Sequence, residues 1–532
     1  MDLLQTEWIP VIREDGFRTR IAPWQIAEMD NPVVELDAPR ADFQGALYQF
    51  LIGLLQTCCP PAEPDDWIDW YEQPPAPAEI QKQFSSVSDA FQLFTSVGSS
   101  AFMQDLELEN GEEKPISGLL IEAPGGKTLR DNLDFFVKRG LADVLCPSCA
   151  AQALFTLQIN APGGGVGHRV GLRGGGPLTT LVVPSGPEQT LWHKLWLNVL
   201  DRDHTSWGAA VKPLSAEIFP WMAPTRVSDK RGVDTLPDDT HPLQMYWSMP
   251  RRIRLHRSDE SCCCDICGSQ SDSAVNGYET RNYGVNYDGP WVHPLTPYRF
   301  DPKNEKLPLS LKGQKGGLGY RHWLGLALRD VDSGDKAAQV INHYVDQKAR
   351  FLDESYTPQI WCFGYDMDNM KARGWIDHRL PLFALSTEQA DRLKETIEQL
   401  ILCARAVLPE LRKQVKSAWF RRPEDHKGDT SVIDQTFWHE TESTFYQLLS
   451  QLAALPKEAV VPAEHYARWY NLMIRSAREL FDYFTLRTAP EGLDLKRVMR
   501  AREQLLKRVY TLKPIKQLKG LADPALKEAV HG

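Results

Sequence analysis

The sequence predicts an α+β protein in which a large, irregular mixed domain over residues 1–384 precedes a C-terminal four-helix bundle over residues 385–532. Two observations predict this division. Short apolar runs alternate with glycine- and proline-rich stretches as far as about residue 380, and this part holds most of the 36 glycines and 37 prolines. Beyond it, apolar residues recur at helical spacing in four long stretches.

The mixed domain is expected to begin with a β-hairpin. The runs WIPVI and FRTRI flank the segment REDG, and Asp15–Gly16 is a typical turn signal. The chain that follows contains no internal repeat and no low-complexity tract, so we expect one large domain with long loops.

The bundle is expected to begin at LSTEQADRLKETIEQLILCARAVLPEL, where Ser386 and Gln389 form a capping box. The second stretch is VIDQTFWHETESTFYQLLSQLAAL, and the third, AEHYARWYNLMIRSARELFDYF, follows Pro462. The fourth, DLKRVMRAREQLLKRVY, carries a basic cluster on its outer face. The short connections between these stretches are typical of a helix bundle.

Charge and hydropathy limit the class of protein. The net charge of −10, from 60 basic and 70 acidic residues, argues against a surface coated with nucleic acid but allows a local basic groove. No run approaches the roughly 18 apolar residues that a membrane span needs. The segment MDLLQTEWIPV does not have the pattern of a signal peptide. We therefore expect a cytoplasmic protein that has no contact with a membrane.

The catalytic motifs considered are missing or degenerate. The segment INAPGGGVGHRVGLRGGGPLTT (159–180) holds eight glycines in 22 residues, but it matches neither a phosphate loop nor G-x-G-x-x-G. IEAPGGKT (121–128) ends as a phosphate loop does, with Ile121 in place of its first glycine. A nucleotide-dependent enzyme that uses GGKT at 125–128 is therefore the alternative to a binding protein. Because H-E-x-x-H, G-x-S-x-G and the kinase motifs are also absent, a non-enzymatic role is favoured.

Two C-x-x-C pairs predict a structural Zn²⁺ site, because two thiolates on one tight turn occupy adjacent tetrahedral vertices. The pairs are Cys146 with Cys149, and Cys264 with Cys267. Cys262 or Cys263 could replace Cys264, and unligated thiols or a redox pair are the alternatives to zinc. A zinc ion here would hold the glycine-rich segment close to ETRNYGVNYDGPW.

Two segments have a composition suited to nucleic acid. A glycine-rich backbone can enter the DNA minor groove, which is about 6 Å wide, and His168, Arg169 and Arg173 would supply charge beside it. In RDNLDFFVKRG, Phe135 and Phe136 stand beside Lys138 and Arg139, a combination typical of base stacking with phosphate contact.

Taken in order, these stretches resemble the large subunit of the type I-E CRISPR Cascade surveillance complex. The matching pieces are LLQTEWIPV, DNLDFFVKRG, CPSCAAQALF, NAPGGGVGHRVGLRGGGPLTT, CDICG, NYGVNYDGPWVHPLTP and FGYDMDNMKARGW, followed by the helical bundle. The resemblance spans the whole chain and keeps the order of the motifs.

The resemblance implies an antiviral defence subunit that is not an enzyme. It implies recognition of the protospacer-adjacent motif in double-stranded target DNA from the minor groove, help in strand separation and R-loop formation, and recruitment of a helicase-nuclease. The implied partners are the target duplex, the 5′ handle of the guide RNA, the backbone, handle-binding and small subunits of Cascade, and the helicase-nuclease.

The resemblance also implies three sets of site residues. The motif-binding set is Gly163, Gly164, Gly165, Gly167, His168, Arg169, Arg281 and Asn282. Val166 stands near the place of the family's contact glycine. The strand-separating wedge is Asp368, Asn369, Met370 and Lys371, with no glutamine among them. The loop near the guide and the motif is Phe135, Phe136, Val137, Lys138 and Arg139. The basic fourth helix would face the displaced strand and the small subunits.

Overall fold

The fold is described from a computed structural model of residues 1–532. It describes all of them except 96–99, 124–129, 132–139, 186–188, 206, 208–213, 231, 304, 314–316, 331–333, 353–355, 357, 369–370, 426, 488–493 and 532. The chain divides into two compact units. The first comprises Met1–Lys315 and Ser333–Leu382, and the second comprises Gly316–Asp332 and Phe383–Gly532.

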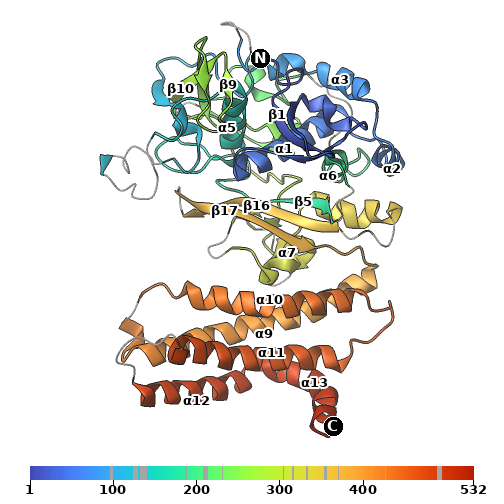
Figure 1. Ribbon diagram of the computed structural model, residues 1–532, viewed down its shortest axis with the longest axis vertical. Helices are drawn as coiled ribbons and strands as arrows, with labels where there is room; N and C mark the ends of the chain where they lie inside the picture. The colour runs from blue at the N-terminus through green and yellow to red at the C-terminus, as the bar shows by residue number, and fades with distance from the viewer. Residues whose placement is uncertain are drawn as a thin grey trace. The chain divides into compact units, whose positions relative to one another are not determined.

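Helix α1 (Ala41–Cys58) runs through the core of the first unit (Figure 1). It is buried on nearly all sides, as expected for a helix that is apolar around its whole circumference. The Phe50 ring meets five other aromatic rings nearly edge-on, at centroid distances of 5.4–5.9 Å: Trp8, Phe91, Phe102, Phe155 and Trp247. Among the described residues, this unit also contains the α-helices α2 (Pro64–Glu72), α3 (Pro77–Ser85), α5 (Pro147–Asn160), α6 (Leu191–Trp196) and α8 (Gln339–His343).

Three antiparallel sheets frame this core. The first has the order β2-β1-β3, from β1 (Ile9–Arg13), β2 (Arg18–Ile21) and β3 (Val33–Leu36), and it confirms the predicted N-terminal hairpin. The second has the order β4-β10-β7, from β4 (Glu112–Pro115), β10 (Ala274–Arg281) and β7 (Arg252–Ser258). The third has the order β17-β16-β5, from β5 (Thr179–Pro184), β16 (Pro358–Asp368) and β17 (Lys371–Pro381).

Short strands complete the first unit. They are β6 (Asp234–Thr235), β8 (Cys262–Cys263), β9 (Gln270–Ser271), β11 (Asn286–Tyr287), β12 (Tyr298–Arg299), β13 (Leu309–Ser310) and β15 (Asp335–Lys336). Long turns and loops connect these strands and helices. The mixture of helix and sheet confirms the predicted α+β class.

The second unit is the expected helical region, with α9 (Thr387–Trp419), α10 (Ser431–Ala453), α11 (Ala463–Asp482), α12 (Leu495–Thr511) and α13 (Lys513–His531). The capping box is confirmed: Ser386 Oγ accepts from the Gln389 amide at 3.3 Å, and Gln389 Oε1 accepts from the Ser386 amide at 3.3 Å. The segment that this unit takes from residues 316–332 holds α7 (Trp323–Ala327) and β14 (Arg329–Asp330). Tyr320 docks that segment, because its ring stacks on Phe445 and its hydroxyl bonds Thr441.

The four predicted stretches form α9, α10, α11 and α12, and the structure adds α13. Helix α12 packs chiefly on α9 and α13 chiefly on α11, so the two follow one another in the fourth position of the bundle (Figure 1). Leu512 between them is extended, and Pro514 has no N–H to continue the hydrogen bonds of α12. On α12, Val498, Ala501, Leu505 and Val509 are buried, whereas Lys496, Arg500, Lys507 and Arg508 are exposed.

Among the described helices, none has both the length and the apolar character needed to cross a bilayer.

Candidate nucleic-acid interface and cysteine cluster

The glycine-rich loop connects the end of α5 at Asn160 to the start of β5 at Thr179. Gly164, Gly165 and Gly167 have φ values of 139°, 87° and 77°. Residues with a side chain rarely adopt these conformations, so glycine is needed for the path of the loop. Gly165 is exposed, and Val166 at the tip is 76% exposed.

The loop is joined directly to the end of β10. The Val166 carbonyl accepts from Asn282 Nδ2 at 2.8 Å, and the Gly167 carbonyl accepts from the Tyr283 amide at 2.8 Å. A Cβ atom on Gly167 would lie 3.0 Å from the Asn282 and Tyr283 side chains, which shows how closely the two segments pack. We call residues 163–169 together with 281–283 the glycine-loop surface.

Three cationic or titratable side chains lie on this surface. His168 is exposed as a residue, but its ring is partly desolvated and its Nδ1 is 2.5 Å from a guanidinium nitrogen of Arg251. This partial desolvation and the charge of Arg251 lower the pKa of His168. Arg169 donates to the Ser228 hydroxyl and carbonyl at 2.7 and 2.6 Å, and its guanidinium lies over the Tyr283 ring. Arg281 is exposed and donates to the Glu109 carbonyl at 3.0 Å. The surface therefore combines bare backbone with side-chain donors.

The prediction that Arg173 supplies charge to a DNA groove is wrong. Arg173 is only 4% exposed. Its guanidinium donates to Thr179 Oγ1 at 3.0 Å, Thr296 Oγ1 at 3.1 Å and Gln49 Oε1 at 2.7 Å. Burial lowers its pKa to about 10. Arg173 therefore anchors the base of the loop to α1 and β5.

Several glycines of the loop serve contacts within the protein. A Cβ atom on Gly171 would lie 3.2 Å from the Ile159 carbonyl oxygen, and one on Gly175 would lie 3.0 Å from the Gly163 amide nitrogen. A Cβ atom on Gly176, which has a φ of 61°, would lie 2.4 Å from Met367 Cγ. These glycines are therefore needed for packing inside the protein, and only the others could contact a ligand. The contact of Gly176 with Met367 also packs the loop on β16.

The predicted wedge lies at the end of the β16–β17 hairpin. Asp368 and Lys371 face each other across the hairpin, and both are exposed. Arg373 binds the Asp366 carboxylate at 2.6 Å and lies 3.6 Å from that of Asp368. Asn369 and Met370 lie outside the described residues. So do the loop with Phe135, Phe136, Val137, Lys138 and Arg139 and the GGKT segment at 125–128.

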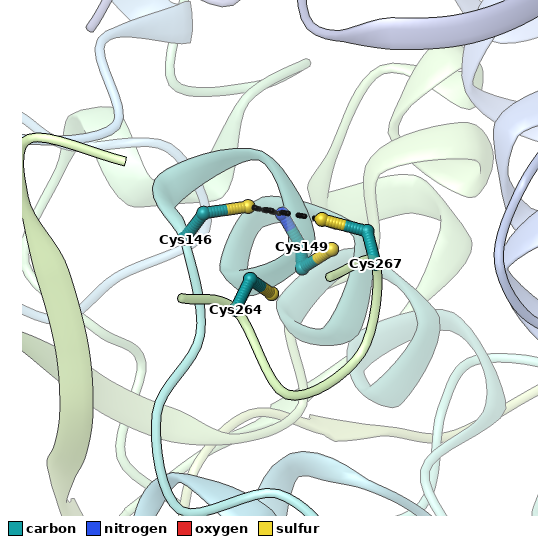
Figure 2. Close-up of side chains that lie close together, drawn as sticks. All are labelled: Cys146, Cys149, Cys264 and Cys267. Atoms are coloured by element: carbon teal, nitrogen blue, oxygen red, sulfur yellow. Dashed lines mark hydrogen bonds between the residues drawn. The ribbon is translucent and has the colours of Figure 1, made fainter. Parts of the chain in front are cut away.

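The structure brings four thiols together: those of Cys146, Cys149, Cys264 and Cys267 (Figure 2). Cys146 caps α5, and its sulfur accepts from the Cys149 amide at 3.5 Å. Cys264 and Cys267 lie on the turn between β8 and β9. All four sulfurs are within 4.8 Å of one another, and those of Cys146 and Cys267 are 3.8 Å apart.

The donor set of this cysteine cluster fits a tetrahedral metal ion. A Zn–S bond of about 2.3 Å places neighbouring sulfurs about 3.8 Å apart in a tetrahedron. Hydrogen bonds from Cys146 and Cys149 hold the pKa of the Cys264 thiol well below its usual value. Hydrogen bonds to Cys146 and Cys264 raise that of Cys149. The number of sulfurs and their separations are what fit Zn²⁺, which the four side chains could hold as thiolates.

Cys262 and Cys263 do not belong to the cluster. Cys262 Sγ donates to the Ser273 carbonyl, and Cys263 Sγ donates to the Gly268 carbonyl. Hydrogen bonds also tie the turn to the segment before α5, since the side-chain carboxylate of Asp265 accepts from the backbone amides of Asp143 and Val144 at 2.8 Å. The two distant segments are thus neighbours, as a shared metal ion requires.

Two contacts of the glycine-rich loop cannot be read from the sequence. Tyr283 lies under Arg169, and Met367 packs on Gly176. Both residues stand in segments that carry the family resemblance, but the segments alone do not show these contacts. Arg251, which holds His168 and the Pro162 carbonyl, lies in the basic run RRIRLHR. That run is visible in the sequence, but its contact with the loop is not.

Comparison with solved structures shows which known proteins share this fold. The fold matches CasA from Thermus thermophilus with a TM-score of 0.68 at 18% identity, covering 96% of this chain and 99% of that one. It matches Cse1 from Acidimicrobium ferrooxidans with a TM-score of 0.66 at 17% identity, covering 97% and 99%. A chain of a CRISPR RNA-guided surveillance complex matches with a TM-score of 0.67 at 16% identity, covering 96% and 99%. The chain therefore has the fold seen in CasA and Cse1.

The sequence identifies the family. The family model described as CRISPR-associated protein Cse1 matches residues 2–480, and the chain belongs to this family. The resemblance found in the sequence is thereby confirmed.

Proposed function

We propose that this chain is the large, non-catalytic subunit of an RNA-guided Cascade complex that recognises the protospacer-adjacent motif of double-stranded DNA. Recognition takes place in the minor groove, through the glycine-loop surface. The backbone of Gly163, Gly164, Gly165 and Gly167 approaches the base edges, and His168, Arg169, Arg281 and Asn282 supply side-chain donors. The structural match to a chain of a CRISPR RNA-guided surveillance complex supports the choice of assembly.

The single observation that carries the proposal is the pair of hydrogen bonds that joins the loop to the end of β10. Because Asn282 and Tyr283 hold the carbonyls of Val166 and Gly167, the exposed loop and the exposed Arg281 belong to one surface. A backbone with few side chains fits a groove about 6 Å wide, and an arginine beside it can bind phosphate or base.

Strand separation is proposed for the hairpin end with Asp368, Asn369, Met370 and Lys371. The packing of Gly176 on Met367 supports this role, because it sets the end of β16 beside the loop that reads the motif. Base pairs next to the motif would then be the first to meet the hairpin.

The remaining contacts follow the family resemblance. Phe135 to Arg139 would lie near the 5′ handle of the guide RNA, and the exposed basic side chains of α12 would face the displaced strand and the small subunits. The completed R-loop would then recruit the helicase-nuclease. The cysteine cluster is proposed as a structural zinc site, because four thiolates fill a tetrahedral shell and leave no position for a substrate.

The first test replaces a glycine of the loop. In the assembled complex, we expect Gly165→Trp to weaken binding of a motif-bearing duplex at least ten-fold, because the indole blocks entry into the groove. The matched control is Gly16→Trp, since Gly16 is also exposed and has a φ of 83°, close to the 87° of Gly165. Gel-shift affinities measure both variants, and equal affinities would exclude the loop from recognition.

The second test replaces the arginine at the end of β10. We expect Arg281→Ala to weaken binding of the motif-bearing duplex by about 1–3 kcal/mol, the usual value of one specific contact. Arg257→Ala is the control, because Arg257 pairs with Val275 at the opposite end of the same two strands. Equal losses of duplex affinity in the two variants would indicate general electrostatic attraction to DNA rather than a sequence-specific contact by Arg281.

A further inference from the structure

A second group of metal-ligating side chains lies in the first unit, away from the cysteine cluster. Asp201 and His204 stand in the turn that follows α6, and His343 ends α8. Asp201 Oδ1 is 2.7 Å from His204 Nδ1, and Asp201 Oδ2 is 2.7 Å from His343 Nε2. One ligand atom from each of the three residues lies within 4.8 Å of the others.

We propose that Asp201, His204 and His343 bind a divalent first-row transition-metal ion, with water in the remaining coordination positions. Two imidazoles and one carboxylate form a ligand set that such ions prefer, and this set typically leaves positions open. The ion is distinct from the zinc proposed for the cysteine cluster, because nitrogen and oxygen donors replace thiolates.

Two of the three donor pairs are close to the separations that an ion requires. Metal bonds of about 2.0–2.2 Å to nitrogen and oxygen place neighbouring donors about 3.0 Å apart in an octahedral shell and about 3.4 Å apart in a tetrahedral one. The two separations of 2.7 Å between Asp201 and the histidines therefore open by about 0.3–0.7 Å, and the donor atoms of the two histidines lie within 4.8 Å of each other. Each imidazole shifts its proton to its other ring nitrogen, so no proton is lost. In His343 that other nitrogen, Nδ1, is buried and has no hydrogen-bond partner among the described residues, so the shifted proton lacks an acceptor there and this step costs free energy.

Two of the three ligands are buried, and the third, His204, is partly exposed to solvent. The side chains of Asp201 and His343 are 0% and 5% exposed, whereas that of His204 is 36% exposed. The ion would therefore enter beside His204 and keep water there. A buried Asp201 shared by two histidines is held in place by its surroundings, which reduces the ordering that binding requires.

The neighbouring segments support a specialised role for this place in the fold. Residues Tyr344–Lys348, directly after His343, form a π-helix, a rare conformation that is frequent at functional sites. The buried Lys348 in that segment directs its Nζ to the carbonyls of Leu197 and Val199, at 2.8 and 2.6 Å. Two backbone oxygens thus accept hydrogen bonds from the Lys348 amine. Burial lowers the pKa of Lys348 well below its usual value, so this lysine repels a metal ion at the site less than a charged lysine would.

The test uses the full-length chain whose cysteine cluster has been loaded with Zn²⁺. Titration with Ni²⁺, followed by calorimetry and by metal analysis after dialysis, is expected to show one further equivalent per chain. His204→Gln is expected to abolish that equivalent and to leave the zinc content unchanged. His256→Gln, which alters a histidine on β7, is the control and should retain it.

His343→Asn provides a second variant, and circular dichroism and thermal unfolding establish that each variant is folded. If His343→Asn does not fold, His204→Gln still decides the result because His204 is partly exposed. Failure of the unaltered chain to bind a further equivalent, or full retention of it in His204→Gln, would overturn the proposal. Neither result depends on DNA binding, so the proposed function is tested separately.

Discussion

At the scale of single residues, Arg173 shows how a charged side chain can serve the loop without touching a ligand. Its guanidinium is buried and bonds side-chain oxygens of Gln49, Thr179 and Thr296, and it also donates to the Ile159 carbonyl at 3.5 Å. The first three residues come from α1, from β5 and from the turn before β12. One side chain thus fixes the base of the glycine-rich loop against three separate parts of the first unit.

Replacement of this residue should therefore affect stability. We expect Arg173→Ala to lower the free energy of unfolding by about 2–4 kcal/mol, because a cavity forms and buried oxygens lose their donor. Arg18→Ala is the control: the Arg18 side chain is 68% exposed and pairs with Asp37, and the expected change is below about 0.5 kcal/mol. Denaturant unfolding measures both, and equal changes would contradict the anchoring role.

The sequence could not predict this arrangement. Arg173 stands beside His168 and Arg169 in a run that looks uniformly suited to DNA. Its three side-chain partners, Gln49, Thr179 and Thr296, lie 124, 6 and 123 residues away along the chain, so only the folded structure distinguishes it from its neighbours. The same holds for Tyr283 and Met367, whose contacts with the loop arise from the packing of β10 and β16.

At the scale of elements, short-range sequence patterns predict the structure best. The two C-x-x-C pairs predicted the four clustered thiols, because each pair needs only a tight turn to bring its sulfurs together. Helical periodicity predicted the positions of α9 to α12, since each buries one apolar stripe. The sequence does not separate α13 from α12, because the basic residues continue across the break at Leu512 and only Pro514 marks that break.

The cysteine cluster leads to a prediction about metal loss. We expect Cys264→Ser to remove one equivalent of zinc per chain and to lower the melting temperature, because metal binding energy contributes directly to folding. The control is Cys263→Ser, since Cys263 is exposed and lies outside the cluster. Elemental analysis and thermal unfolding measure both. Unchanged metal content in Cys264→Ser would show that these thiols do not bind zinc.

At the scale of the whole molecule, burial of histidines makes stability depend on pH. Burial, with a further contribution from Arg173, holds the pKa of His293 well below its usual value. Burial also lowers the pKa of His343, to about 4. The folded protein therefore keeps these imidazoles neutral, whereas the unfolded chain takes up protons below about pH 6.5.

The free energy of unfolding should consequently fall as the pH falls below about 6.5, by up to about 1.4 kcal/mol per pH unit for each such histidine. His293→Asn should reduce this slope, whereas replacement of the exposed His439 by Gln should not. Unfolding curves between pH 5 and 7 provide the measurement. A slope that is the same in all three proteins would exclude His293 as a source of the effect.

The contact of Gly176 with Met367 has a mechanical consequence. At this point the backbone of the loop lies directly against the methionine side chain, and a single added carbon on the glycine would collide with it. A displacement of the end of β16 towards the loop would therefore have to move the backbone around Gly176 as well, because Met367 leaves no free space there. We expect the two segments to shift together.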